Sequence, residues 1–252
     1  MKGFVVGNPR SGTMFVSQLL SVARAGVCGH EVLIELAPAL ISRATEWYEG
    51  RCQPKAVLKL FDEYQRSSAE IDSNWKLSWV LPLLLEQFPD VGVVHLIRDP
   101  RTNVRSFVEL GYYSGLAGNP CFPASDRLRE WLCTMPRLPR TDWHRLDDLE
   151  RCCAFWNETH QLIESALEGH PRVLNIRVED LASDSQVQRL IEFFSLPMPS
   201  TEALVELRAS MINSKVNDKR DVAFLRPLVW SAKHERRVWQ WCGQIARWYG
   251  YH

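Results

Sequence analysis

The strongest constraint on the fold of this chain is an apolar segment that runs directly into a glycine-containing turn and then into a helical pattern. Residues 4–6 (Phe-Val-Val) are typical of a buried strand, residues 7–13 read Gly-Asn-Pro-Arg-Ser-Gly-Thr, and residues 13–24 carry apolar side chains at helical spacing. A turn between a strand and a helix points several backbone N–H groups at one place, and the helix dipole adds positive potential there. We therefore predict an anion-binding loop at residues 7–13.

The residue types within this loop support the same interpretation. Gly7 and Gly12 allow backbone angles and close approaches that side chains block. Arg10 supplies a permanent cation whose donor fork suits phosphate or sulfate oxygens, and the hydroxyls of Ser11 and Thr13 add donors. A plain strand-to-helix turn is the alternative, but this combination of glycines, cation and hydroxyls favours an anion site.

The loop differs from a Walker A motif at one decisive position. Gly7 and Gly12 have the separation found in G-x-x-x-x-G-K-[ST], but Thr13 occupies the lysine position. A kinase or nucleoside triphosphatase needs that lysine on the β- and γ-phosphates and a hydroxyl on magnesium. A P-loop-type small-molecule kinase is therefore a disfavoured alternative, and a non-catalytic nucleotide-binding protein is a second one. No acidic cluster suggests a metal site, and we expect none.

The remaining chain alternates between strand and helix patterns. Such alternation predicts a three-layer α/β fold, with a central parallel sheet flanked by helices as in the P-loop nucleotide hydrolases. The length fits one domain over residues 1–252, with an irregular excursion at 110–140 that we interpret as a lid or part of an acceptor site. Further strands are predicted at residues 56–60, 91–97 and 172–178, and further helices at 79–88, from about 102, and at 147–167, 184–194 and 231–249.

A second anion-binding segment is predicted at residues 93–106. Its strand delivers Arg98 to the carboxyl edge of the sheet, where ligands bind in open α/β folds, and Ser106 follows eight residues later on the next helix. Both residues can then face one anion beside the first loop. The alternative is that Arg98 and Asp99 form a structural pair and that Ser106 lies on the helix surface.

Together, residues 7–13 and residues 96–101 with Ser106 resemble the two nucleotide-binding signatures of sulfotransferases that use 3′-phosphoadenosine 5′-phosphosulfate (PAPS). The resemblance implies transfer of a sulfuryl group from PAPS to a hydroxyl or amine of a small-molecule or glycan acceptor. It also implies that the first loop binds the 5′-phosphosulfate, while Arg98 and Ser106 bind the 3′-phosphate. The implied nucleotide-binding residues are Arg10, Ser11, Gly12, Thr13, Met14, Phe15, Arg98 and Ser106.

Weaker similarities extend the resemblance over most of the chain, with some departures. Phe88-Pro89, residues 178–181 and residues 247–251 resemble family segments, but Val178 replaces a tyrosine that often lies near the adenine. Met14 stands where the family often has a second threonine. No late glycine-rich loop is evident, so Lys219, Arg220 or Arg226 are the candidates to complete the 3′-phosphate site.

The general base of the implied mechanism has several candidates. Sulfuryl transfer builds charge on the leaving phosphate, which Arg10 and the loop amides would stabilise, and a base must accept the acceptor's proton. The histidine that cytosolic family members often carry is missing from residues 73–76. Glu31 is the better candidate, because other family branches place a catalytic glutamate after the first helix. The remaining candidates are His30 as the nearest rival base, Lys76 as a cation near the sulfate, and Glu35 and Lys59 as outside choices.

Composition limits the partners of the chain. Thirty basic and thirty acidic residues balance, so no global basic field favours nucleic acid or an anionic membrane surface. Seven scattered cysteines predict reduced thiols in a cytoplasmic protein, and no run reaches the ~18 apolar residues of a membrane helix. The pattern leaves the oligomeric state open. Aromatic residues of the excursion (Tyr112, Tyr113, Phe122 and Trp131) suggest a partly apolar acceptor.

Overall fold

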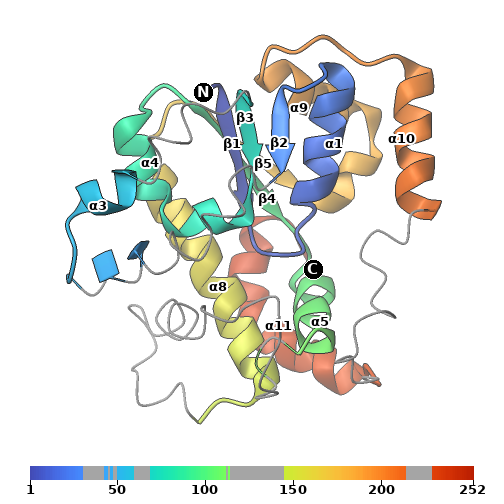
Figure 1. Cartoon of the computed structure of the whole chain (residues 1–252). Helices are drawn as coiled ribbons and strands as arrows, with labels where there is room; N and C mark the ends of the chain where they lie inside the picture. The colour runs from blue at the N-terminus through green and yellow to red at the C-terminus, as the bar shows by residue number, and fades with distance from the viewer. Residues whose placement is uncertain are drawn as a thin grey trace.

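The computed structural model describes residues 1–30, 43–44, 46–47, 50–59, 69–111, 113, 145–213 and 229–252, without the side chains of 211–213. A five-stranded, wholly parallel sheet forms the centre of this part, with the strand order β2-β3-β1-β4-β5 (Figure 1). The predicted α/β fold with a central parallel sheet is confirmed. The strands are β1 (Gly3–Gly7), β2 (Cys28–His30), β3 (Ile71–Ser73), β4 (Gly92–Ile97) and β5 (Val173–Arg177).

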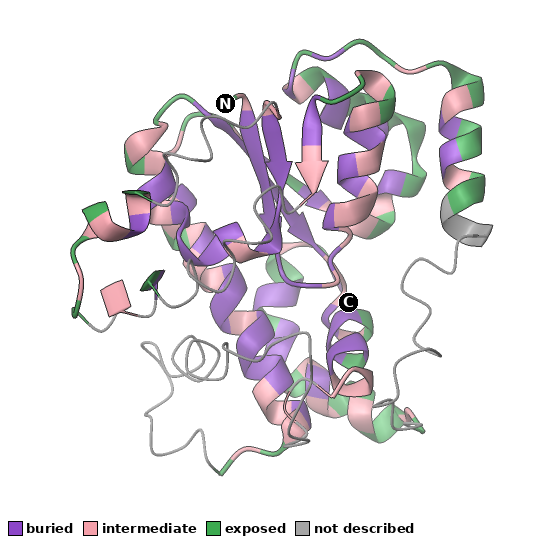
Figure 2. Ribbon diagram, in the orientation of Figure 1, coloured by how far each residue is buried: buried purple, intermediate pink, exposed green. Residues whose placement is uncertain are grey.

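The central strands are buried on both faces, as Figure 2 shows. Alternate side chains of β1 enter different cores: Val5 packs with α1 (Thr13–Ala23) and α9 (Asp184–Phe193), whereas Phe4 and Val6 pack with α4 (Leu81–Gln87). This period of two is what a strand between two helical layers requires. On the β4 side, Ile97 joins a third core with α5 (Pro100–Glu109), α8 (Asp148–Leu167) and α11 (Ala232–Trp248).

The register places the two predicted anion segments side by side. Gly7 at the end of β1 pairs with Leu96 near the end of β4, so the turns that follow both strands leave the same edge of the sheet. Each turn leads directly into a helix, α1 after β1 and α5 after β4. Asp99 caps α5 by accepting a hydrogen bond from the Arg101 amide, and Pro100 occupies the first helical position, where a missing N–H does no harm.

The predicted strand at residues 56–60 is wrong, and two real strands were not predicted. Residues 54–58 form the short helix α3 (Pro54–Leu58), which begins at a proline and buries Val57. On one side of β1 the sheet continues instead with β3 and then β2, which have three residues each. Such short strands contain too few residues to show an alternating pattern, and Asp72 and Ser73 are polar although buried.

Helix boundaries also differ from the predictions. The helix expected at 79–88 is divided into a 3₁₀ turn η4 (Trp75–Trp79) and α4, and the helix expected from about residue 102 begins at Pro100. The excursion at 110–140 lies outside the described residues except for Leu110, Gly111 and Tyr113. The remaining elements are the 3₁₀ turn η5 (Val178–Ala182) and α10 (Thr201–Asn213).

Candidate active site

The loop after β1 has a backbone that depends on its glycines. Gly12 has φ 95°, and a Cβ at this position would lie 2.6 Å from Cγ2 of Val178. A Cβ on Gly7 would lie 2.5 Å from the carbonyl oxygen of Leu96. Arg10 also adopts a positive φ, 64°, which is uncommon for a residue with a side chain and marks local strain. The predicted role of the two glycines is therefore confirmed.

Side chains from distant elements hold this loop in place. The hydroxyl of Ser78 accepts a hydrogen bond from the Gly7 amide at 3.1 Å and donates one to the Gly7 carbonyl at 2.9 Å. Nδ2 of Asn103 on α5 donates to the Pro9 carbonyl at 3.0 Å. The loop is thus preorganised by buried hydrogen bonds. Two further bonds run from Asn8 Nδ2 to the Trp156 carbonyl (3.2 Å) and from Ser73 Oγ to the Thr13 carbonyl (2.6 Å).

Several hydrogen-bond donors of the loop are left for a ligand. Ser11 is fully buried, and its hydroxyl has no hydrogen-bond partner among the described residues. Thr13, Met14 and Phe15 form the first turn of α1, where the helix itself supplies no acceptors for the amides. Gly12 at the N-cap has no side chain that could accept from them. This set of donors fits a phosphate or sulfate group.

Arg10, Arg98 and Ser106 meet beside the loop, as predicted. One terminal nitrogen of Arg98 donates to the Arg10 carbonyl at 2.7 Å, and Nε of Arg10 donates to the Ser106 hydroxyl at 3.3 Å. Burial lowers the pKa of Arg98, Glu179 opposes this effect, and the neighbouring Arg10 cation adds to it. Within the described part of the chain neither arginine has an ion-pair partner, so both charges are available to an anion.

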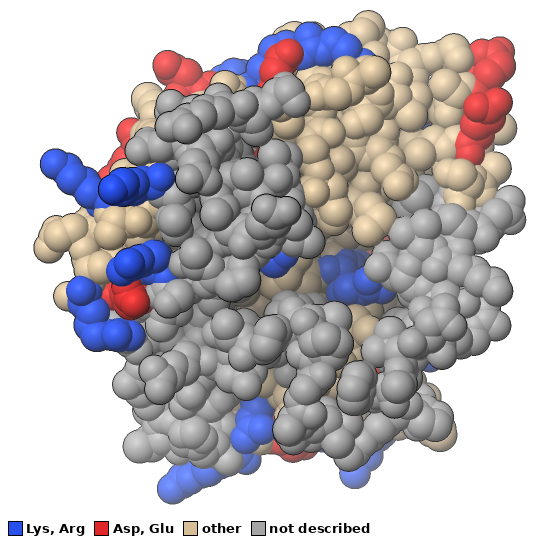
Figure 3. Space-filling view, viewed as in Figure 1, with Lys and Arg blue, Asp and Glu red and all other residues tan. Residues whose placement is uncertain are grey.

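A pocket of about 420 Å³ opens over these residues. Arg101 and Arg105 also line it, but Asp99 pairs with Arg101 (2.6 Å) and Glu109 with Arg105 (2.7 Å). The expected alternative of an Arg98–Asp99 pair is therefore wrong, because Asp99 both caps α5 and binds Arg101. Figure 3 shows basic side chains at the bottom of a hollow near the middle of one face. The remaining lining residues are Arg10, Arg98, Thr102, Ser106, Glu109, Trp230 and Glu235.

The described catalytic candidates lie at the carboxyl ends of β2 and β3. His30 ends β2, and its Nδ1 lies 2.9 Å from the Ser73 carbonyl. Because a carbonyl can only accept, Nδ1 donates this hydrogen bond. Lys76 lies in η4, with its ammonium 5.3 Å from the centre of the Trp75 ring.

Of the remaining candidates, only Lys59 lies in the described part of the chain. It is exposed and follows α3, which packs against α4. Glu31, Glu35, Lys219, Arg220 and Arg226 lie outside the described residues.

Several residues that build the site were missed by sequence reasoning. Asn8, Asn103 and Ser78 bond the loop backbone, and all three are buried. Their signal in the sequence is weak, because a buried amide in a helix looks like any other polar residue until its partner is known. Val178, which departs from the family tyrosine, packs directly over Gly12.

His95, in the middle of β4, is fully buried. Its ring nitrogens lie 2.8 Å from Nδ1 of His160 and 3.1 Å from a carboxylate oxygen of Glu164. Burial lowers the pKa of both histidines, and that of His160 falls well below its usual range. His95 is thus part of a core network rather than a base at the sheet edge.

These features define an α/β protein with a P-loop-like anion cradle and a second basic site beside it. A family model described as a sulfotransferase domain matches residues 3–203, and the chain belongs to this family of enzymes. It is a sulfotransferase.

One solved structure supports the fold, and a second is reported for comparison. The sulfotransferase domain from the Synechococcus PCC 7002 olefin synthase is 14% identical, with a TM-score of 0.50 over 97% of this chain and 94% of that one. The sulfotransferase domain from the curacin biosynthetic pathway is 13% identical, with a TM-score of 0.48 over 98% of both chains. A search of curated proteins found no match.

Within the part of the chain that the structure describes, no three His, Cys, Asp or Glu side chains are grouped so that they could hold a metal ion. None of the described helices is long and apolar enough to cross a membrane.

Proposed function

We propose that this enzyme transfers a sulfuryl group from PAPS to a hydroxyl or amine of a small-molecule or glycan acceptor. The observation that carries the proposal is that two cations, Arg10 and Arg98, meet beside the hydroxyl of Ser11. Among the described residues, neither cation has an ion-pair partner and this hydroxyl has no hydrogen-bond partner. The loop donors suit a 5′-phosphosulfate. The pocket with Arg98 and Ser106 suits a 3′-phosphate.

A nucleoside triphosphate suits this arrangement less well than a bisphosphate. Thr13 occupies the place of the Walker lysine, and its carbonyl is bound by Ser73. The cations lie instead toward α5, on the side of the loop that faces β4. The charge distribution therefore favours a nucleotide phosphorylated at both its 5′ and 3′ positions over the kinase alternative.

The chain's own groups would stabilise the developing charge. When bound, PAPS supplies the sulfuryl group and a phosphate leaving group. Arg10 and the first-turn amides of α1 are fixed in position before the reaction, which is the condition for electrostatic stabilisation of a transition state. Lys76 is proposed to add a cation from the β3 side. We expect no metal to take part.

Glu31 remains the proposed general base, with His30 as its rival. His30 ends an edge strand at the same carboxyl edge of the sheet as the anion loop. A base here would take the proton of the acceptor as the sulfuryl group is transferred. The excursion at 110–140 is proposed to contribute a partly apolar surface for the acceptor.

Isothermal titration calorimetry with 3′-phosphoadenosine 5′-phosphate (PAP) and with ATP, each with and without magnesium, tests the proposal. Tight binding of PAP that does not need magnesium supports it. Tight binding of ATP with no binding of PAP would overturn it in favour of a kinase. Binding of PAP without any turnover in a screen of hydroxyl and amine acceptors with labelled PAPS would favour a non-catalytic nucleotide-binding protein.

A cytoplasmic location is also proposed. The five cysteines that the structure describes are free thiols, and four of them are buried (Cys28, Cys152, Cys153 and Cys242). Free thiols are typical of proteins in a reducing compartment.

A further inference from the structure

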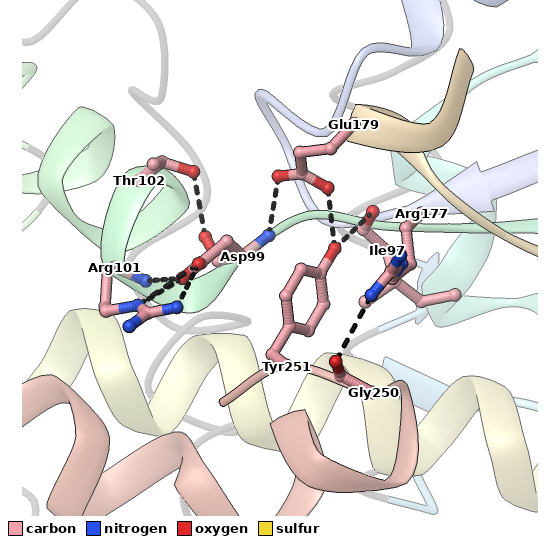
Figure 4. Close-up of polar contacts among 8 residues, drawn as sticks. All are labelled: Ile97, Asp99, Arg101, Thr102, Arg177, Glu179, Gly250 and Tyr251. Carbon is pink, nitrogen blue, oxygen red and sulfur yellow. Dashed lines mark hydrogen bonds and ion pairs between the residues drawn. The ribbon is translucent and has the colours of Figure 1, made fainter. Parts of the chain in front are cut away.

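The carboxylate of Glu179 and the phenol of Tyr251 contact the backbone on both sides of Arg98 (Figure 4). Oε1 of Glu179 accepts a hydrogen bond from the Asp99 amide at 3.0 Å. The hydroxyl of Tyr251 donates to Oε2 of the same carboxylate at 2.7 Å and lies 3.3 Å from the Ile97 carbonyl. The residues before and after Arg98 are therefore tied to one pair of side chains, which come from η5 and from the segment after α11.

Tyr251 is itself held in place. Gly250 has φ 80°, a turn that favours glycine, and its carbonyl accepts from Arg177 at 3.2 Å. The guanidinium of Arg177 also lies 5.4 Å from the centre of the Tyr251 ring, and Asp180 binds that guanidinium at 2.7 and 2.8 Å. Tyr251 is 7% exposed, so its hydroxyl points into the protein and not into water. The phenol is thus held in a fixed position beside the backbone that carries Arg98.

The same pair also acts on the charge of Arg98. Arg98 is partly buried next to Arg10, and both effects disfavour its charged form. Glu179 is the largest influence in the opposite direction, yet it forms no ion pair with Arg98. Its carboxylate oxygens are occupied by the Asp99 amide and the Tyr251 hydroxyl. Glu179 therefore stabilises the charged form of Arg98 through its negative potential and leaves the N–H donors of Arg98 to other partners.

We infer that Glu179 and Tyr251 are positioning residues for nucleotide recognition, which hold Arg98 so that the site prefers a 3′-phosphorylated nucleotide over one without this phosphate. The inference rests on the proposed function, since it assigns the 3′-phosphate to Arg98. Neither side chain lines the pocket, so each acts through the backbone and the charge of Arg98.

Tyr251→Phe tests the inference, because it removes the hydroxyl and keeps the ring over Arg177. Kd values for PAP and for adenosine 5′-monophosphate are measured by calorimetry. Loss of one hydrogen bond to a charged group is expected to weaken PAP binding by about tenfold and to leave binding of the monophosphate within about twofold. An equal loss for both nucleotides, or no loss for either, would overturn the inference.

Glu179→Gln is the second variant, because it keeps the shape and one acceptor oxygen but removes the charge. The preference for PAP over the monophosphate is expected to fall by at least as much as in Tyr251→Phe. A retained preference in a variant whose unliganded melting temperature is unchanged contradicts the positioning role.

Tyr249→Phe is the matched control. Its hydroxyl also donates to a carboxylate, Oε1 of Glu164 at 2.6 Å, but this pair belongs to the His95 network in the core. The control is expected to lower stability without changing the preference for PAP. A loss of preference as large as that of Tyr251→Phe would show a general packing effect and overturn the inference.

The outcome for the unmodified protein separates the two proposals. A wild-type chain that binds PAP no better than the monophosphate contradicts the proposed function itself. A wild-type chain with a clear preference that Tyr251→Phe retains contradicts only the positioning role.

Discussion

The carboxyl edge of the sheet has two halves that are built differently. Around β1 and β4, buried side chains bond the loop backbone directly, as Ser78 does at Gly7 and Asn103 does at Pro9. Around β2 and β3 the strands have three residues each, and β2 is an edge strand that loses burial from Cys28 to His30. A rigid site favours binding of a nucleotide that is the same in every reaction cycle. The catalytic and acceptor-binding groups are instead proposed to come from the half around β2 and β3.

The largest expected effect separates chemistry from nucleotide binding. Glu31→Gln should reduce turnover by about 10²- to 10⁴-fold, which is the range for loss of a general base, and should leave PAP binding unchanged. Steady-state kinetics and calorimetry on the same preparation measure both. Unchanged turnover would remove Glu31 from the mechanism and make His30→Asn the next variant.

The next largest effect is expected at the cation that follows β4. Arg98→Met keeps an unbranched apolar side chain but removes the charge. PAP binding should therefore weaken by about 10²-fold, as for loss of a charged hydrogen-bond partner in a partly buried site. Arg105→Met, at a residue that pairs with Glu109 in the same pocket, is the control and should have a much smaller effect. Equal losses in both variants would mean that only the overall charge of the pocket matters.

The rigidity of the anion loop can be tested with two glycines of similar backbone conformation. Gly12→Ala combines φ 95° with a contact of 2.6 Å to Val178, whereas Gly26→Ala has φ 73° and nothing within 4 Å. We expect Gly12→Ala to lower the free energy of unfolding by about 2–4 kcal/mol and Gly26→Ala by about 1 kcal/mol. Urea denaturation checks this, and equal losses would indicate that the loop adapts.

The smallest effect is a pH dependence of stability that arises in the core, away from both halves. Burial lowers the pKa of His95 and His160 in the folded chain, so the unfolded chain binds protons first as the pH falls. Their contribution to the free energy of unfolding is complete above the histidine pKa of the unfolded chain, about 6.5. Below this pH the contribution is lost, at up to about 1.4 kcal/mol per pH unit for each histidine. Urea denaturation between pH 5 and 8 measures this slope, and His160→Gln should reduce it.

The predictable part of this molecule is the part with a local signal. Residues 7–13 and residues 93–106 each contain a strand, a turn and a helix start in unbroken order, so their fold and their anion-binding residues could be inferred from spacing alone. The strand predicted at 56–60 failed because an apolar run of that length also suits a helix, and Pro54 starts one. The strands β2 and β3 were missed because three residues show no period.

The sequence by itself determined the family-defining chemistry: an anion loop without the Walker lysine, followed by Arg98 and Ser106. Only the tertiary structure decided that Asp99 binds Arg101 rather than Arg98, and that Glu179 and Tyr251 hold the backbone around Arg98. The physical reason for the second of these is sequence separation. Hydrogen bonds between residues 72 to 154 positions apart depend on the sheet register and on the packing of α11, and no local pattern records either.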